Sequence, residues 1–243
     1  MQATAATAAA QTSASTRSVS QWRDLYRVGA ISALAYVALV VAAIVLDSLM
    51  PSPVTGGRAT LEFITAHGSL YVIGQYLWLL PGVFGILVFL ALFPVLRAAS
   101  PSWAAIGSLL GAASWALTLA IPTTSRGAPA LAVLAEHFAA ASSEAERAVF
   151  ATAAETLIAQ NNTVMLPGVL STAAILIVGL VMLRGGFPRL VAILGVATGL
   201  VGVASEALRF VLPAAFVVYG LLLLAWFAAV AWMLFQLSSD DSA

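Results

Sequence analysis

Seven polar side chains stand out because they lie within or at the ends of strongly apolar segments. They are Asp47, His67, Gln75, Asn161, Asn162, Glu206 and Arg209. A charged side chain at the centre of a membrane span costs about 2.5–3.5 kcal/mol, so such groups usually face a bundle interior and pair. Glu206 and Arg209 also have the i,i+3 spacing of an ion pair on one helix face. These seven residues are therefore the candidates for binding or chemistry.

The side-chain types allow several kinds of chemistry. Asp47 or Glu206 could act as a general base, which needs its proton within about 3 Å and an oriented partner. His67, Asp47 and Glu206 are also metal-ligand types, but no H-x-x-x-H or E-x-x-H spacing puts two of them on one helix face. The chain has no cysteine, which removes thiolate ligands and nucleophiles. We therefore expect neither a metal nor another cofactor.

The composition is that of an integral membrane protein. Of the 243 residues, 62% are apolar and only 8% are charged, against roughly 25% charged in ordinary soluble domains. Ten basic residues balance ten acidic ones, so no net field favours nucleic acid as a partner. The partner that the composition predicts is the lipid bilayer.

Six apolar segments are long enough to cross a membrane, because about twenty residues at ~1.5 Å rise span a ~30 Å hydrocarbon core. They cover about 28–50, 70–93, 102–122, 162–183, 188–211 and 214–237. The predicted fold class is all-α, a six-span transmembrane helix bundle over residues 27–237. The polar stretch 123–160 predicts an amphipathic helical loop, with Ser142 or Ser143 as a helix N-cap, rather than a separate domain.

Two tails flank the predicted bundle. Residues 1–26 are rich in alanine, threonine and serine without apolar periodicity, which predicts a disordered tail. Basic residues follow these small residues instead of preceding them, which is the reverse of a signal peptide. Residues 238–243 form a short acidic tail.

Prolines and glycines predict local features of the spans. Pro81 and Pro167 should each kink a span, because proline removes a backbone donor and its ring clashes with the preceding turn. The spacing G-x-x-x-G occurs in the third and fifth predicted spans. Small residues at this spacing let helix backbones approach closely, so we expect tight packing at both places.

The arginines predict the orientation. With the N-terminus inside, six arginines fall on the inner side and four on the outer side. The inner ones are Arg17, Arg23, Arg27, Arg97, Arg184 and Arg189, and the outer ones are Arg58, Arg126, Arg147 and Arg209. Positively charged residues favour the cytoplasmic side of short loops. We therefore expect both termini in the cytoplasm and the protein in the inner (plasma) membrane.

In that orientation all seven candidate residues fall at the outer side, and two interpretations follow. In the first, they mark span ends in the headgroup region, and Glu206 pairs with Arg209. In the second, they line a small outward-facing polar pocket among the first, second, fourth and fifth spans. Kinks at Pro81 and Pro167 would favour the pocket, because freed carbonyl groups need partners in a cavity.

Two stretches resemble a known family. RVGAISALAY opens the first span, and GGFPRLVAILGVATGLVG contains an F-P-R-x-x-x-x-L-G pattern where the fifth span begins. Together with the long loop after the third span and the proline after the fifth, they resemble the DUF4386 family of bacterial six-span membrane proteins, over residues 27–237. The resemblance implies the six-span fold. The family has no established activity that the resemblance would carry over.

Three functional hypotheses follow. The first is a non-catalytic scaffold or regulatory protein, or one that binds a small amphiphilic ligand in the outer pocket or a membrane-protein partner. The second is a small secondary transporter, which would need inverted repeats and broken spans near the midplane; internal symmetry between the two halves is weak. The third is an intramembrane enzyme that uses Glu206 or Asp47 as a general base.

Overall fold

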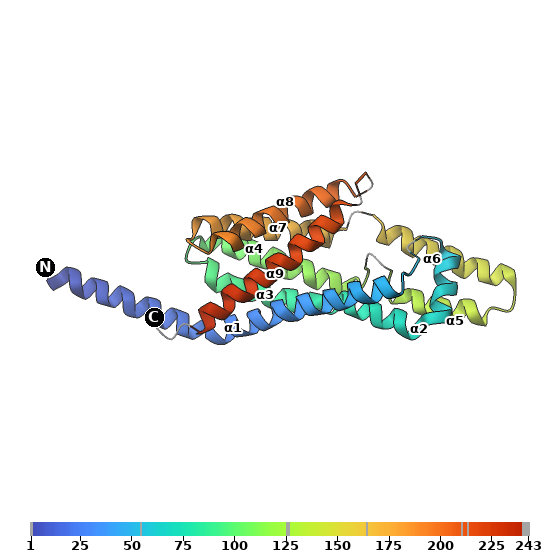
Figure 1. Ribbon diagram of the computed structural model, residues 1–243, viewed down its shortest axis with the longest axis horizontal. Coiled ribbons are helices and arrows are strands. Elements are labelled where there is room, and N and C mark those ends of the chain that lie inside the picture. The colour runs from blue at the N-terminus through green and yellow to red at the C-terminus, as the bar shows by residue number, and fades with distance from the viewer. Residues whose placement is uncertain are drawn as a thin grey trace.

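A computed structural model gives the structure of the chain and describes residues 2–53, 55–124, 127–163, 165–209, 211–212 and 214–239, with the backbone alone for 2–20. Within these ranges the regular structure is helical, apart from one isolated bridge between Thr124 and Gly127. The helices are α1 (Gln2–Leu49), α2 (Gly57–Leu79), α3 (Pro81–Leu96), α4 (Pro101–Ala120), α5 (Ala130–Ala140), α6 (Glu144–Asn161), α7 (Leu166–Arg184), α8 (Arg189–Ala207) and α9 (Ala215–Ser239) (Figure 1).

The predicted six-span, all-α fold is confirmed. Six helical stretches in the described residues are long and apolar enough to cross a membrane. They correspond to α1 from Gln21, to α2 with α3, to α4, to α6 with α7, to α8 and to α9. The predicted span 162–183 falls on the α7 part of the fourth stretch, and the other predicted bounds differ by a few residues, apart from the earlier starts of the first and second stretches. Apolar run length is a strong signal because the hydrocarbon core fixes the length of a span.

The six spans form a closed ring in chain order. Each span packs against the next one, and α9 packs back against α1. The start of α1 and the end of α9 lie at one end of the ring, which we call the terminal end (Figure 1). The opposite end, where α2, α5 and α6 gather, is called the cap end.

Aromatic side chains fill the interior of the ring. Tyr36 of α1 stacks on Phe227 of α9, with ring centroids 3.9 Å apart and planes inclined by 9°. Trp115 of α4 meets Tyr36 edge-on at 5.3 Å, and Trp226 meets Phe227 in the same way. Such pairs add to the stabilisation that comes from burial alone. The ring therefore encloses a packed core built by helices from both ends of the chain.

The G-x-x-x-G glycines lie where helices come closest, as predicted. A Cβ atom on Gly111 of α4 would lie 2.2 Å from Cδ1 of Phe89 in α3. A Cβ atom on Gly199 of α8 would lie 2.6 Å from the Cα atom of Leu176 in α7. Only glycine permits these contacts.

The polar loop between the third and fourth spans is helical, and it packs onto the first part of α2. Residues 57–66 of α2 together with α5 and α6 form a unit that we call the helical cap (Figure 1). Its apolar core includes Leu61, Phe138 and Ile158. This core is separate from that of the ring, but it depends on α2, so the cap is an extension of the bundle and not an independent domain.

Charges hold the cap together at its surface. The backbone N–H of Gly57, at the start of α2, donates to the Glu155 carboxylate of α6, and Arg58 pairs with Glu144. A carboxylate at a helix N-terminus satisfies an unpaired donor and complements the helix dipole. Ser143 caps α6, since its hydroxyl accepts from the N–H of Glu146 at 3.2 Å. The predicted N-cap is therefore confirmed.

The helix breaks agree only in part with those predicted. α2 ends at Leu79 and α3 begins at Pro81, where a helix break was expected, but Leu80 between them keeps helical φ and ψ values of −55° and −34°. The kink expected at Pro167 is wrong, because α7 begins at Leu166 and a proline in the first turn costs no helical hydrogen bond. An unpredicted break lies at His67, where φ is −131° and ψ is 28°. It separates the cap part of α2 from its membrane part.

The N-terminal segment also differs from its prediction. The predicted disordered tail, residues 1–26, is helical from Gln2 onward because α1 begins there. Its last part, from Gln21, belongs to the first span, and Tyr26 is buried. Alanine has the highest helix propensity, and packing of Tyr26 adds to it. The predicted acidic tail begins within α9, and residues 240–243 lie outside the described residues.

Candidate functional site

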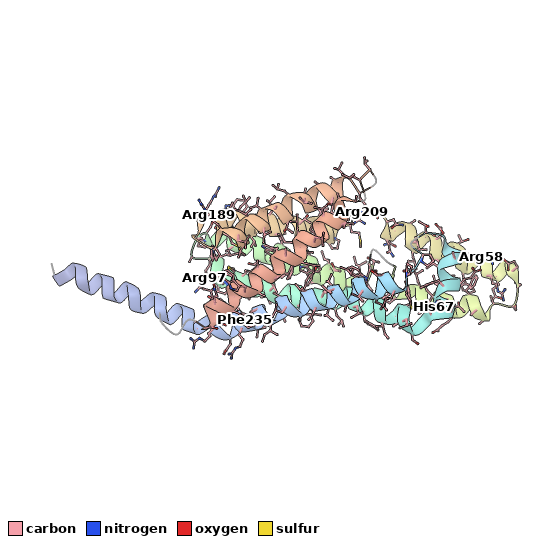
Figure 2. All side chains as sticks on the ribbon, in the orientation of Figure 1. Arg58, His67, Arg97, Arg189, Arg209 and Phe235 are labelled. Atoms are coloured by element: carbon pink, nitrogen blue, oxygen red, sulfur yellow. The ribbon has the colours of Figure 1, made fainter. Side chains whose placement is uncertain are left out.

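The helix directions place all seven candidate residues toward the cap end. Figure 2 shows His67 and Arg209 on that side, and Arg97 and Arg189 at the opposite end of the ring. The seven residues do not converge on one pocket, however. Asp47 and Gln75 belong to α1 and α2, whereas Glu206 belongs to α8, whose main contacts are with α7 and α9.

The first group lies where α1 ends beside α2. The Trp78 indole N–H donates to Oδ2 of Asp47 at 2.9 Å. Gln75 is only 3% exposed, and its Oε1 accepts from the Thr124 hydroxyl at 3.0 Å. A buried amide is stable only when it is hydrogen-bonded. Thr124 lies 49 positions further along the chain, so no local sequence pattern could have indicated this contact.

A half-open pocket lies between these helices, and we call it the Asp47 pocket. Its lining residues are Leu46, Asp47, Met50, Ser52, Phe63, Leu70, Tyr71, Gly74 and Gln75. Its volume is about 20 Å³, which is roughly the space that one water molecule needs. The pocket thus combines apolar walls with the polar groups of Asp47, Ser52 and Gln75.

Tyr71 fixes the segment between α4 and α5 against this pocket. Its hydroxyl donates to the carbonyl of Ala128 at 3.1 Å and accepts from the N–H of the same residue at 3.3 Å. Gly127, with φ of 136°, lets the chain turn back toward Tyr71. Tyr71 and Trp78 have no distinguishing signal in the sequence, because a tyrosine or tryptophan in an apolar run looks like any other core residue.

The second group is an ion pair between Glu206 and Arg209. The Arg209 guanidinium donates through Nε at 3.3 Å and through Nη2 at 3.0 and 3.1 Å, so both carboxylate oxygens are bound. The side chains are 6% and 17% exposed, respectively. The guanidinium also lies 4.5 Å from the Phe216 ring centroid, a cation–π contact. The predicted i,i+3 pair is therefore confirmed.

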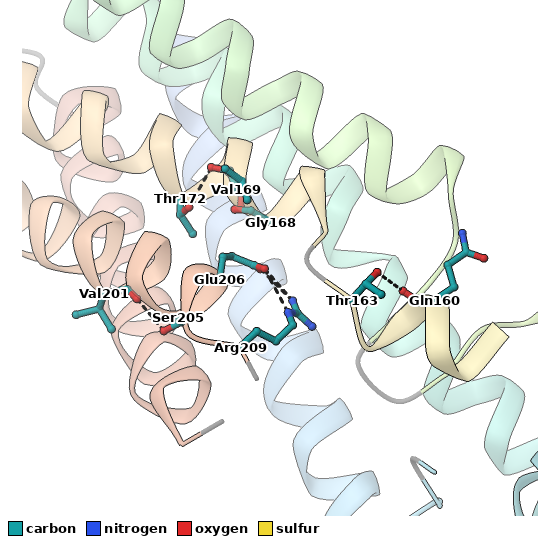
Figure 3. Close-up of polar contacts among 10 residues, drawn as sticks. Gln160, Thr163, Gly168, Val169, Thr172, Val201, Ser205, Glu206 and Arg209 are labelled. Atoms are coloured by element: carbon teal, nitrogen blue, oxygen red, sulfur yellow. Dashed lines mark hydrogen bonds and ion pairs between the residues drawn. The ribbon is translucent and has the colours of Figure 1, made fainter. Parts of the chain in front are cut away.

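Gly168, in the first turn of α7, lies against the Glu206 carboxylate. Figure 3 shows Glu206 between Gly168 and the Arg209 guanidinium. A Cβ atom on Gly168 would lie 2.1 Å from Oε1 of Glu206. The carboxylate occupies the space that any other residue at position 168 would fill, near the positive end of the α7 dipole. Arg209 and the helix dipole both place positive charge beside the carboxylate, which suits a structural ion pair.

The remaining candidates have separate environments. His67 is exposed, and its Nδ1 lies 3.1 Å from the carbonyl oxygen of Phe63. Asn162 is exposed at the end of α6. Asn161 is 4% exposed, and neither its Oδ1 nor its Nδ2 has a hydrogen-bond partner in the described part of the chain. Within that same part, no three His, Asp or Glu side chains gather as metal ligands would.

Comparison with known proteins gives a family for this fold and these sites. No curated protein and no solved structure shows a match to the chain. The family described as "Domain of unknown function (DUF4386)" matches residues 31–237, a range that includes most of the first and sixth spans and all of the other spans, the helical cap and both polar groups. The resemblance seen in the sequence is thereby confirmed, and the chain belongs to the DUF4386 family.

Proposed function

We propose that this protein is a non-catalytic membrane protein that binds a small amphiphile, with the headgroup of the amphiphile in the Asp47 pocket. The observation that carries the proposal is the lining of the pocket, which sets Asp47, Ser52 and Gln75 among apolar side chains. Ligand sites in proteins typically have this character, with apolar walls and a few polar groups that fix orientation.

The surface beside the pocket suits the alkyl chain of such a ligand. Val45 and Leu49 of α1 are 52% and 75% exposed, and Leu70 and Ile73 of α2 are 43% and 50% exposed. Leu70 itself lines the pocket, and each of the other three is next in sequence to a residue that lines it. A ligand with its headgroup in the pocket could therefore lay its tail along apolar surface that lipid otherwise covers.

The two alternative hypotheses have less support. A transporter needs a route through the bundle, whereas aromatic side chains fill the interior of the ring. An enzyme needs a carboxylate placed for proton transfer. Glu206 is instead held by Arg209, and Asp47 accepts from Trp78. Both arrangements suit fixed binding or structural groups better than a general base.

We further propose that the cap end faces away from the cytoplasm and that the membrane is the inner (plasma) membrane. The start of α1 and the end of α9 lie at the terminal end (Figure 1), and six of the ten arginines fall on that side in the sequence. A fluorescent-protein fusion to the C-terminus should be fluorescent, and an alkaline phosphatase fusion there should be inactive. The opposite pair of results would reverse the orientation.

A photoreactive dodecanol that carries a diazirine in its chain tests the binding proposal. In nanodiscs it should label residues 45–52 and 63–75, and excess dodecanol should suppress the labelling. Gly74 lines the pocket, so the side chain in Gly74→Leu should fill it. The substitution should not strain the helix, because a Cβ atom there would meet only Cδ2 of Leu46, at an ordinary contact distance of 3.5 Å. Gly220→Leu is the matched control, since a Cβ atom there has no neighbour within 4 Å.

Each outcome of this experiment is decisive. Loss of labelling in Gly74→Leu, with normal labelling in Gly220→Leu, supports the site. Equal labelling of the wild type and Gly74→Leu, or labelling spread evenly over the six spans, overturns it. Thermal unfolding of each variant shows whether it is folded. The competition with unlabelled dodecanol tests saturable binding in the wild-type protein alone.

A further inference from the structure

We infer that the helical cap is a lid on the Asp47 pocket, hinged at His67 and closed in this structure. This inference rests on the proposed function and adds the way in which a ligand gains access to the site. It depends on three observations, namely how the cap is attached to the spans, where α2 is broken, and which cap residue lines the pocket.

The cap packs on the membrane bundle almost entirely through α2. Among the described helices, α5 and α6 pack on α2 and on each other, and at most one marginal contact joins either of them to another span. The chain segments 121–129 and 162–165 also connect the cap to α4 and α7. The cap core and the ring core are separate clusters of buried side chains. Because side-chain packing is concentrated on one helix, the cap can move as a unit about that helix.

The break in α2 lies at the base of the cap. His67 has φ of −131° and ψ of 28°, so the helix is already interrupted there. A Cβ atom on the next residue, Gly68, would have no neighbour within 4 Å apart from the backbone of its own helix. Hinges are typically a few residues that absorb changes in φ and ψ. His67 and Gly68 provide what a hinge needs, an interrupted helix and free space beside it.

Phe63 connects the cap to the pocket. Of the described residues that line the pocket, Phe63 alone belongs to the cap, and the others belong to the end of α1, to the connector after it, or to α2 beyond the break. The Phe63 ring lies 4.8 Å from the His67 ring, and its carbonyl oxygen lies 3.1 Å from Nδ1 of His67. A rotation of the cap at His67 therefore moves Phe63 away from the other walls and widens the pocket.

The small size of the pocket makes such a movement necessary for binding. Its volume of about 20 Å³ is roughly the space of one water molecule, so it admits no group much larger than a hydroxyl while the cap is closed. Two hydrogen bonds between the Tyr71 hydroxyl and Ala128 hold the chain two residues before α5. Contacts this few allow the cap to open transiently, on the μs–ms timescale of hinge motions.

A single introduced cysteine measures the opening, because the chain has none of its own. Gly74→Cys fits the pocket, since a Cβ atom there meets only Cδ2 of Leu46, at 3.5 Å. N-ethylmaleimide is much larger than a water molecule, so in nanodiscs it should modify this variant only while the cap is open. Adding Gly68→Ala should slow the modification about fivefold, because alanine resists leaving the helical conformation when the hinge bends. Gly220→Ala, which also has open space, is the matched control and should not change the rate.

Two further substitutions test whether Phe63 closes the pocket. Phe63→Ala removes the movable wall, so it should speed the modification and abolish the effect of Gly68→Ala. Phe150→Ala, at a partly buried phenylalanine of the cap that does not line the pocket, should leave the effect of Gly68→Ala in place. Thermal unfolding identifies any variant that fails to fold, and the comparison of Gly68→Ala with Gly220→Ala then decides.

The outcomes separate the lid from the proposed function. Modification that is slowed by Gly68→Ala but not by Gly220→Ala, with no such slowing once Phe63 is replaced, supports the lid. Equal rates with and without Gly68→Ala refute the lid, even if the photoreactive dodecanol labels the pocket as proposed. Slowing by Gly68→Ala without any labelling by dodecanol refutes the proposed amphiphile and supports the lid.

Discussion

Replacing Gly168 with alanine should break the Glu206–Arg209 ion pair without touching either charged residue. The new Cβ atom would lie 2.1 Å from Oε1 of Glu206 and 2.9 Å from its Cδ, so the carboxylate would have to move. A movement large enough to remove this overlap would lengthen at least one of the hydrogen bonds to Arg209, which are now 3.0 to 3.3 Å.

The magnitude follows from the burial of the pair. Breaking a fully buried ion pair costs about 3–5 kcal/mol, and an exposed pair is worth about 0–1 kcal/mol. With side chains 6% and 17% exposed, the Glu206–Arg209 pair lies near the buried limit, so we expect a cost of about 3 kcal/mol. Alanine recovers about 0.5–1 kcal/mol of helix propensity. Gly168→Ala should therefore destabilise the protein by about 2 kcal/mol.

A double-mutant cycle with Glu206→Ala isolates the cause. The three heavy atoms nearest to the new Cβ all belong to the Glu206 side chain. In the Glu206→Ala background, Gly168→Ala should therefore be neutral or stabilising by up to about 1 kcal/mol. The free energy of unfolding is measured in mixed micelles by titration with sodium dodecyl sulfate, followed by circular dichroism.

Gly220→Ala is the control for the general effect of alanine in a span, since its Cβ would have open space. It should be neutral or slightly stabilising. If Gly168→Ala costs the same with and without the Glu206 carboxylate, the cost arises from the backbone of α7 and not from the ion pair.

Three further predictions concern packing, the cap and the link between them. Gly111→Ala should cost about 2–3 kcal/mol in the same titration, because the added methyl group meets the Phe89 ring at 2.2 Å; a neutral result would contradict the close packing of α3 and α4. Tyr71→Phe should speed hydrogen exchange at the Ala128 amide, since that N–H donates to the lost hydroxyl; unchanged exchange would show that the contact is not formed. Ser143→Ala should lower the free energy of unfolding by about 1 kcal/mol and speed hydrogen exchange in the first turn of α6. Ser142→Ala is the matched variant, and a larger effect there would contradict Ser143 as the cap.

Much of the fold could be predicted because the bilayer reduces it to a few local rules. Apolar run length set the number of spans, and Ser143 followed by glutamates marked the start of α6. Pro167 was misread because a proline early in a segment fits a first turn as well as a kink. The break at His67 has a weak local signal in the glycine that follows it, which a long apolar pattern hides.

The candidate site was less accessible from the sequence, because its contacts join distant residues. The Glu206–Arg209 pair was predictable from the i,i+3 spacing. The bond from Thr124 to Gln75 depends on the path of the segment after α4, which apolar periodicity does not specify. Separating the Asp47–Gln75 group from the Glu206–Arg209 pair requires knowing which helices are neighbours, and a list of spans contains no such information.

The order of spans around the ring has a consequence for synthesis. Apart from a small contact between α3 and α7, every contacting pair of spans except one is also consecutive along the chain, so each span can dock on its predecessor as it leaves the translocation machinery. The exception is the seam between α9 and α1, which forms last and brings Trp226 and Phe227 into the interior. Until that seam closes, the nascent protein exposes an unfinished flank to lipid, and a chain truncated before α9 should be a substrate for membrane quality-control proteases.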